Sequence, residues 1–293
     1  MISSHYRHHN KISYWIENVI TNQPKKVGIM FRYRNLSPQE RDIILHQQTE
    51  YAHSGSYNHH KELGIYVCKQ CDSPLYMSSK KFPSGCGWPS FEEEIDGAVE
   101  KRLDPDGRRM EIICAHCHGH LGHVFVGEHL TKANVRHCVN SLSLLFIPAH
   151  TKEGYENAFF AGGCFWGIEA ALKSLPGVIS TKVGYMGGHV SDPTYREVCA
   201  GQTGHLETVQ VIFDPSRLSY EDLLRFFFDI HNPFNQGIDQ GPQYESYLFY
   251  LTEMQKNSIE KIMDNLTRRG IRVLTKVKPA STFYPAEENH QNY

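Results

Sequence analysis

The spacing of apolar residues predicts two kinds of element in the second half of the chain. Apolar residues that alternate with polar ones predict strands over 157–161, 178–185, 205–213 and 271–277. Apolar residues at helical spacing predict helices after Cys164, Ser219 and Thr252, and the serine and the threonine are suited to cap the helices that they open. Strands mixed with helices at this spacing indicate an α/β or α+β sandwich.

The first half has a different pattern, rich in glycine, proline and short β-type runs. A helix of about a dozen residues is predicted to begin at Ser37, because Pro38 follows the cap and Glu40 lies three residues after it. The pattern then predicts a small, mostly β domain over 33–147. Around this domain we distinguish three further segments: an N-terminal extension (1–32), a polar linker (148–156) and the second domain (157–293).

Composition limits the function classes. At roughly 150 residues per domain, 293 residues correspond to two domains. The apolar fraction of 40% and the charged fraction of 21% are those of an ordinary globular chain and exclude a disordered polyelectrolyte. The formal net charge of −2 argues against nucleic acid as a partner, since binding phosphates needs a basic surplus.

No membrane segment is expected, because no run approaches the roughly 20 apolar residues of a membrane span. Between Ile12 and Ile20, apolar residues form a helical stripe that Glu17 and Asn18 interrupt, so the stripe is too broken for a signal-peptide core. We interpret it as a short helix docked on its own domain rather than on a membrane surface. The expected compartment is the cytoplasm, although an export leader that had been removed would leave no trace.

Four of the eight cysteines form two C-x-x-C pairs, Cys68 with Cys71 and Cys114 with Cys117. Two such pairs can supply four thiolates to a tetrahedral zinc ion. The 42 residues between the pairs exceed the roughly 15–20 of a zinc ribbon, so a whole subdomain is expected between the two halves of the site. A redox-active dithiol in each pair is the alternative, but two matched pairs in one chain favour structural zinc.

Two further cysteines lie in settings that favour a thiolate. On the predicted strand around Cys138, the residues Arg136, Cys138 and Asn140 share one face, and a cation beside a thiol stabilises its ionised form. Cys164 follows two glycines that turn a strand into a helix, so free amides and the helix dipole act on its sulfur. The aromatic pair Phe165 and Trp166 directly after it implies an apolar pocket.

One carboxylate falls on an apolar face. Glu207 alternates with Val209, Val211 and Phe213 on the same side of a predicted strand. Burial there raises the pKa of a carboxyl, which suits a general acid; the alternative is an edge position where Glu207 reaches water. Downstream, Asp239 and Tyr244 lie in a loop rich in glycine and proline that can project into a pocket.

With these residues in place, the chain resembles a fusion of the two types of peptide-methionine sulfoxide reductase. In 33–147 the B type is matched by both C-x-x-C pairs and by Ser84-Gly85-Cys86-Gly87-Trp88-Pro89-Ser90-Phe91, His120-Leu121-Gly122-His123-Val124-Phe125 and Arg136-His137-Cys138-Val139-Asn140-Ser141. In 157–293 the A type is matched by Gly163-Cys164-Phe165-Trp166-Gly167, Pro193-Thr194-Tyr195-Arg196-Glu197-Val198, Gly204-His205-Leu206-Glu207 and Tyr284-Pro285-Ala286-Glu287. The implied fold is a mostly-β, zinc-pinned B-type domain followed by an α+β two-layer sandwich of the A type.

The resemblance implies a role for each matched residue. In the first domain Cys138 is the nucleophile, Cys86 is the resolving thiol, one of two histidines donates the proton, and the substrate pocket comprises Trp88, His120, His123, Arg136 and Asn140. In the second domain Cys164 is the nucleophile and Glu207 the proton donor. There Phe165 and Trp166 enclose the substrate methyl group. Tyr195, Asp239 and Tyr244 bind the sulfoxide oxygen or influence its protonation.

The implied reaction is reduction of free or peptide-bound methionine sulfoxide, the R epimer in the first domain and the S epimer in the second. Thiolate attack leaves a cysteine sulfenic acid, which a second thiol converts to a disulfide and an external reductant such as thioredoxin resets. The expected cofactor is structural zinc, with no organic cofactor. The expected partners are proteins or peptides with oxidised methionine and a thiol reductant, without nucleic acid or membrane.

Two positions depart from the family pattern. Many B-type enzymes carry an aspartate about four residues after the second histidine, where this chain has Gly127. The A-type tail with its resolving cysteine has no counterpart in this sequence, so we expect Cys164 to be reset by an external thiol. The alternatives are resolution by Cys199, which shares a face with Tyr195 if that segment is helical, and a tail that is absent from this chain.

Two other function classes explain part of the sequence. A zinc-module binding protein explains both C-x-x-C pairs but not Cys138, Cys164 or Glu207. A general disulfide oxidoreductase explains reactive thiols but normally uses a C-x-x-C pair for redox chemistry. Zinc content and turnover of single sulfoxide epimers discriminate among the three.

Overall fold

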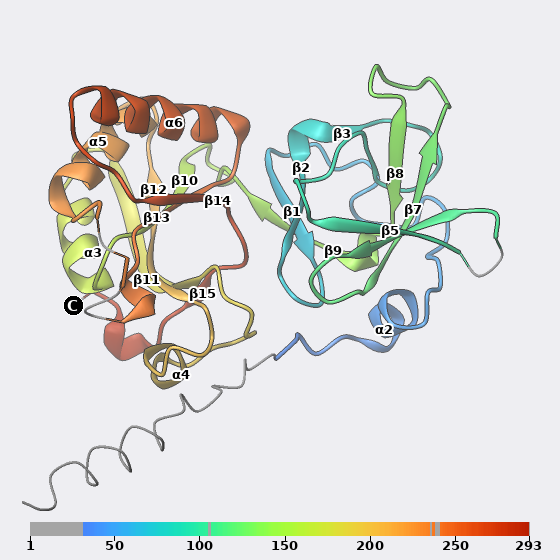
Figure 1. Cartoon of the computed structure of the whole chain (residues 1–293), viewed down its shortest axis with the longest axis horizontal. Coiled ribbons are helices and arrows are strands. Elements are labelled where there is room, and N and C mark those ends of the chain that lie inside the picture. Colours follow the sequence, from blue (N-terminus) through green and yellow to red (C-terminus); the bar gives the residue numbers. More distant parts are fainter. Residues whose placement is uncertain (1–31, 105–106, 235, 238–240, 293) are drawn as a thin grey trace, which may run out of the picture.

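The computed structural model describes residues 32–104, 107–234, 236–237 and 241–292, which form two lobes (Figure 1). The predicted N-terminal helix and Asp239 lie outside the described residues. The first lobe is mostly β-structure and the second combines a sheet with helices, which confirms the predicted fold class. Among the described residues, no helix has the length and apolar character needed to cross a membrane.

Two antiparallel sheets build the first lobe. The smaller sheet has the order β2-β1-β9, formed by β1 (Gly64–Cys68), β2 (Pro74–Met77) and β9 (Leu144–Pro148). The larger sheet has the order β3-β4-β8-β7-β6-β5, formed by β3 (Lys81–Phe82), β4 (Ser90–Phe91), β8 (Val135–Val139), β7 (His120–Val126), β6 (Met110–Cys114) and β5 (Val99–Leu103). Tyr66, Tyr76 and Phe91 are fully buried in the core of this lobe.

The predicted first helix exists but is shorter than expected. α2 (Pro38–Ile44) begins with a capping box, in which the Ser37 hydroxyl accepts from the Glu40 amide and the Glu40 carboxylate accepts from the Ser37 amide. The helix ends after seven residues. Gln47 then adopts a left-handed φ of +57°, which a right-handed helix cannot contain.

The second lobe is a six-stranded sheet with the order β14-β13-β10-β12-β11-β15, in which only the β13–β14 pair is parallel. Its strands are β10 (Glu156–Ala161), β11 (Val178–Met186), β12 (Leu206–Phe213), β13 (Tyr247–Tyr250), β14 (Lys276–Pro279) and β15 (Tyr284–Pro285). Its helices are α3 (Phe165–Lys173), α4 (Tyr195–Cys199), α5 (Tyr220–Ile230) and α6 (Glu253–Arg268). α3 packs on β11 and β12, and α6 packs on α5 and β13. Ser219 and Thr252 cap α5 and α6, as predicted.

The last strand was predicted wrongly over most of its length. The alternating segment 271–277 enters the sheet only at Lys276, where parallel pairing with Tyr247 begins. Before that point the Leu274 amide donates to the Pro233 carbonyl, so this stretch joins a loop instead of the sheet. Alternation of apolar and polar residues does not by itself distinguish an extended loop from a strand that is hydrogen-bonded in a sheet.

The two lobes pack against each other through the smaller sheet. All five residues of β1 are buried. Ile65 and Val67 belong to the buried cluster of the second lobe, whereas Tyr66 and Cys68, on the opposite face, belong to the core of the first. The connection from β9 to β10 is a tight turn in which the Thr151 amide donates to the Tyr155 carbonyl (2.8 Å). The lobes are thus joined by packing as well as by the chain.

Candidate metal centre and active sites

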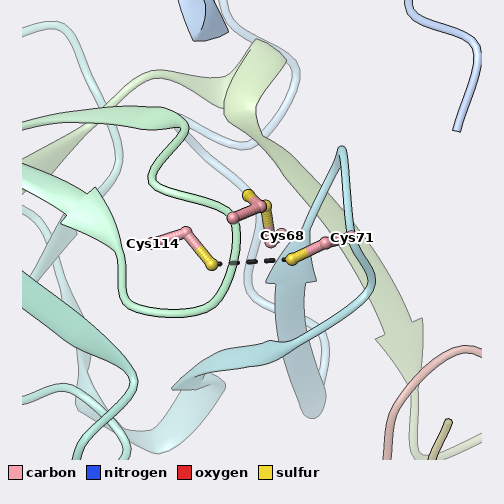
Figure 2. Close-up of side chains that lie close together, drawn as sticks. Cys68, Cys71 and Cys114 are labelled. Carbon is pink, nitrogen blue, oxygen red and sulfur yellow. Dashed lines mark hydrogen bonds between the residues drawn. The ribbon is translucent and has the colours of Figure 1, made fainter. Parts of the chain in front are cut away.

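The four cysteines of the C-x-x-C pairs meet at the base of the first lobe, where the turn after β1 faces the turn after β6. The Sγ atoms of Cys68, Cys71, Cys114 and Cys117 all lie within 4.8 Å of one another. Figure 2 shows three of them, with the contact between Cys71 and Cys114 at 3.6 Å. Zinc–sulfur bonds of about 2.3 Å in a tetrahedron place the sulfurs roughly 3.8 Å apart, so the cluster has the size of a Zn²⁺ site.

Both turns have the same backbone shape. In the first, the Asp72 amide donates to the Cys68 carbonyl (2.9 Å), and in the second the His118 amide donates to the Cys114 carbonyl (2.8 Å). Asp72 and His118 both have left-handed φ angles, of +62° and +58°. Each turn therefore directs its two thiols toward the same point, and the expected subdomain, β2 to β6, lies between the two turns.

The first candidate active site lies on the larger sheet, where Cys138 in β8 faces Cys86 from the loop before β4. Their Sγ atoms are 3.7 Å apart, and the Ser84 hydroxyl lies 3.0 Å from the Cys86 sulfur. The hydrogen bond from Cys138 lowers the pKa of Cys86 to about 4. The same contact and burial raise the pKa of Cys138, against the lowering effect of Arg136. The contact between the two sulfurs makes the ionisation of each thiol depend on the other.

Two histidines of β7 lie beside this pair, because the β7–β8 register places His123 opposite Cys138. A carboxylate contacts each ring: Glu111 lies 2.6 Å from His120 Nδ1, and Asp104 lies 2.8 Å from His123 Nε2. Burial lowers the pKa of His120. Its Nε2 is buried and has no hydrogen-bond partner among the described residues.

Arg136 is held at the edge of this site. Its guanidinium makes two hydrogen bonds to the Glu128 carboxylate (2.7 and 2.8 Å) and lies over the Phe125 ring, 4.4 Å from the centroid. Gly127 leaves open space where the family pattern has an aspartate. The carboxylates beside Arg136 and His123 are instead those of Glu128 and Asp104.

Glu50, which the sequence did not single out, joins three parts of the site. Its amide donates to Asn140 Oδ1 (3.1 Å), and its carbonyl accepts from Trp88 Nε1 (3.1 Å). Its buried carboxylate accepts from the amides of Ser141 (2.6 Å) and Leu142 (3.1 Å). Asn140 and Trp88 are thereby fixed by backbone contacts. No local pattern marks Glu50, because these partners lie 38 and 90 residues away in the sequence.

The second candidate active site begins at the predicted glycine turn. β10 ends at Ala161, and Gly163, with a left-handed φ of +119°, turns the chain into α3. Cys164 is the N-cap residue of that helix and is exposed. The thiol therefore lies at the N-terminal end of α3, the position that the sequence predicted for it.

Glu207 lies behind this thiol, on the apolar face of β12 and only 1% exposed. Its Oε2 accepts from the Phe165 amide (3.0 Å), the first amide of α3. Burial raises the pKa of Glu207 to about 7, against the opposing effects of that bond and of Tyr244. The carboxyl can hold a proton near neutral pH, and the edge position considered for it is wrong.

Aromatic side chains surround the same thiol. The buried His290 ring stacks on Trp166, with centroids 5.6 Å apart, and lies 4.4 Å from the Tyr195 ring and 5.9 Å from Phe165. The structure thus brings together the predicted pair Phe165 and Trp166 with Tyr195, and it adds His290. That histidine lies beyond the last quoted motif, so no sequence pattern indicated its place here.

Glu287 fixes the position of two tyrosines. Its carboxylate accepts from the Tyr195 amide (2.8 Å) and from the Tyr185 hydroxyl (2.9 Å). It thereby links the segment after β15 to the start of α4 and to β11. The motif that ends at Glu287 was noted in the sequence, but the contact spans 92 residues and no periodicity indicates it.

Cys199 is exposed. The predicted helix exists as α4, and Tyr195 and Cys199 lie on one face of it. Hydrogen bonding to Cys199 raises the pKa of Tyr195.

Comparisons with known proteins agree with this geometry. A family model described as peptide methionine sulfoxide reductase matches residues 156–293, and a SelR domain model matches residues 36–148. The peptide methionine sulfoxide reductase MsrA of Methanothermobacter thermautotrophicus is 48% identical over 145 residues, which are 47% of this chain and 86% of that protein. MsrA of Thermus thermophilus is 52% identical over 142 residues, 47% of this chain and 81% of that protein.

Among solved structures, reduced Mxr1 from Saccharomyces cerevisiae is 31% identical and has a TM-score of 0.46, over 48% of this chain and 85% of that one. Both matched families are oxidoreductases that reduce peptide methionine sulfoxide. The chain therefore belongs to the peptide methionine sulfoxide reductases, with a SelR domain followed by an MsrA-type domain.

Proposed function

We propose that the two lobes reduce opposite epimers of free or peptide-bound methionine sulfoxide, the R epimer at Cys138 and the S epimer at Cys164. The observation that carries the proposal is the presence of two separate thiols, each with its own proton source. Cys138 lies beside two histidines, and Cys164 lies in front of a buried carboxyl whose pKa is about 7. Assays of each epimer against serine variants of the two cysteines test it.

In the second lobe the chemistry requires an acid as well as a nucleophile. The sulfoxide oxygen is a poor leaving group until it is protonated. The Cys164 thiolate attacks the substrate sulfur while Glu207 supplies a proton to the oxygen. The attack joins the two sulfurs; the protonated oxygen then passes as hydroxyl from the substrate sulfur to the Cys164 sulfur. The bond between the two sulfurs breaks, methionine leaves, and Cys164 becomes a sulfenic acid. Phe165, Trp166 and Tyr195 form the pocket, and Tyr244 acts on the protonation of Glu207.

In the first lobe the two thiols divide the work. The proton that Cys86 and Cys138 share passes over 3.7 Å to Cys86, which leaves Cys138 as the attacking thiolate beside Arg136. His120 or His123 protonates the sulfoxide oxygen. Cys86 then attacks the sulfenic acid on Cys138, and the pair forms a disulfide with loss of water. Thioredoxin or another thiol reductant reduces that disulfide.

The four-cysteine cluster holds zinc in a structural role, since four protein ligands leave no open position for a substrate. The sulfur separations are those of a metal site, and the donor set suits Zn²⁺. Zinc fixes the two turns between which β2 to β6 lie. No organic cofactor takes part in the proposed steps.

Replacing Cys117 by serine should release zinc and lower the melting temperature of the first lobe, because a structural zinc site contributes to folding directly. The measurement is metal content by emission spectroscopy together with thermal unfolding. Cys199→Ser, which removes an exposed thiol outside the cluster, is the matched control and should retain the metal. Full metal content and unchanged melting in the Cys117 variant would refute the zinc assignment.

The resetting of Cys164 depends on whether a second thiol reaches it. We expect the sulfenic acid on Cys164 to be reduced by an external thiol, with Cys199 as the alternative. After one equivalent of S-sulfoxide without reductant, peptide mass spectrometry should find Cys164 as a sulfenic acid without a disulfide partner. A dominant Cys164–Cys199 disulfide, together with loss of thioredoxin-driven turnover in Cys199→Ser, contradicts this expectation.

A further inference from the structure

The first zinc turn reaches across the boundary between the lobes. Asp72 directly follows Cys71 and is only 5% exposed. Its carboxylate accepts hydrogen bonds from three side chains of the second lobe, Thr282 (2.6 Å), Tyr284 and Ser191 (3.4 Å). Arg34 of the first lobe adds a charged hydrogen bond (2.8 Å). A buried carboxylate with this many donors is stabilised in one position and holds its partners there.

A second contact joins Arg32, which lies just before the first lobe, to the second lobe. Arg32 makes two hydrogen bonds to the Glu197 carboxylate (2.9 and 3.2 Å), and its Nε donates to the Ser191 carbonyl (2.7 Å). Glu197 also completes the capping box of α4, by accepting from the Thr194 amide (2.8 Å). The guanidinium is therefore attached to the first turn of the helix that carries Tyr195.

These two contacts converge on one substrate-pocket residue. Asp72 holds Tyr284 in β15, and three residues later Glu287 accepts from the Tyr195 amide. Arg32 holds α4 through Glu197. The Tyr195 backbone is thus held from two sides, and both sides are anchored in residues that precede the second lobe.

We infer that Asp72 and Arg32 are positioning residues for the S-epimer pocket, so that the SelR lobe is part of what makes the MsrA-type site competent. The inference rests on the proposed S-epimer function of the second lobe. It extends that function, because the SelR lobe then supports the active site of the MsrA-type lobe. The SelR lobe orients Tyr195 without touching the substrate.

The structure offers a variant that removes the Asp72 carboxylate without strain. Asp72 has a left-handed φ of +62°, which glycine adopts freely, so Asp72→Gly deletes the side chain and leaves the turn intact. Asp192→Gly is the matched control. It makes the same change at an exposed aspartate with φ of +48° in the same interface, where the backbone carbonyl contacts Arg32. Thr282→Val tests the contact from the other lobe, away from the zinc turn.

Two measurements on the full chain test this inference: the kinetics with each epimer and hydrogen–deuterium exchange. In Asp72→Gly with Arg32→Ala we expect kcat/KM for the S epimer to fall about tenfold, mainly through KM, because misplaced binding groups lose alignment with the substrate. The R epimer should be reduced at the wild-type rate. Hydrogen–deuterium exchange should become faster in peptides that cover 195–200 and 284–291. Thr282→Val should show a smaller change in the same direction, and Asp192→Gly none.

Unchanged exchange in these peptides would overturn the inference, as would faster exchange with unchanged S-epimer kinetics. Zinc content is measured in each variant, so that a change caused by metal loss shows itself in Asp72→Gly and not in Thr282→Val. Failure of the proposed function has a different signature. It appears as S-epimer turnover that survives Cys164→Ser, whereas exchange needs no turnover and still reports the coupling.

Discussion

Replacing Cys164 by serine should abolish reduction of the S epimer and leave reduction of the R epimer unchanged, and Cys138→Ser should do the reverse. Each substitution removes the sulfur that is proposed to attack the substrate in one site. The activity that is lost should fall below detection, since a missing nucleophile is not replaced by binding alone. The measurement is separate turnover of the two purified epimers.

The controls for this prediction are folding and metal content. Both variants should melt as the wild type does and retain their zinc, because Cys138 and Cys164 are outside the four-cysteine cluster. If either folded variant loses both activities, the assignment of one epimer to each lobe is wrong.

Glu207→Gln should lower the S-epimer rate by roughly 10²–10⁴-fold, the usual effect of losing a general acid. Glutamine keeps the size and can still donate a hydrogen bond, but it cannot deliver a proton. Glu156→Gln makes the same change at another glutamate of the same sheet, outside the site, and should have little effect. A fall smaller than about tenfold would move the acid role to Tyr195 or Tyr244.

The effect of Glu207→Gln on the S-epimer rate should depend on pH. Burial raises the pKa of Glu207 to about 7, so the carboxyl is protonated below pH 7 and loses its proton above it. The ratio of wild-type to Glu207→Gln rate should therefore be largest at low pH and should shrink as pH rises through 7. Using the ratio removes pH effects that are common to the two proteins. A ratio that stays constant from pH 6 to pH 9 contradicts a titrating acid at this position.

Local rules explain why the sequence predicted the position of several candidate groups. The turn before Cys164, the caps of α5 and α6, and the apolar face that holds Glu207 all follow from neighbours a few residues apart. The C-x-x-C pairs likewise need only their own spacing. In these cases the residue types and their order determine the conformation, and the structure has the expected form.

The rest of the site depends on contacts between distant segments. Glu50, Asp104 and Glu287 act through partners that no periodicity connects to them. The charge on the Cys86–Cys138 pair depends on a sulfur contact across 52 residues, whereas the sequence showed only Arg136 beside Cys138. The exposure of Cys199 and the late entry of β14 into its sheet are likewise set by packing. These features could be identified only from the three-dimensional structure.

The most direct test of two independent sites is to locate the oxidised sulfur after a single turnover. The wild-type protein, fully reduced, receives one equivalent of one epimer without reductant, is treated with a sulfenic-acid probe, and is digested for mass spectrometry. The account predicts that the S epimer labels Cys164 and leaves the first lobe reduced, and that the R epimer produces a Cys86–Cys138 disulfide and leaves Cys164 unlabelled. Labelling of Cys164 by the R epimer, or a Cys86–Cys138 disulfide produced by the S epimer, would contradict it.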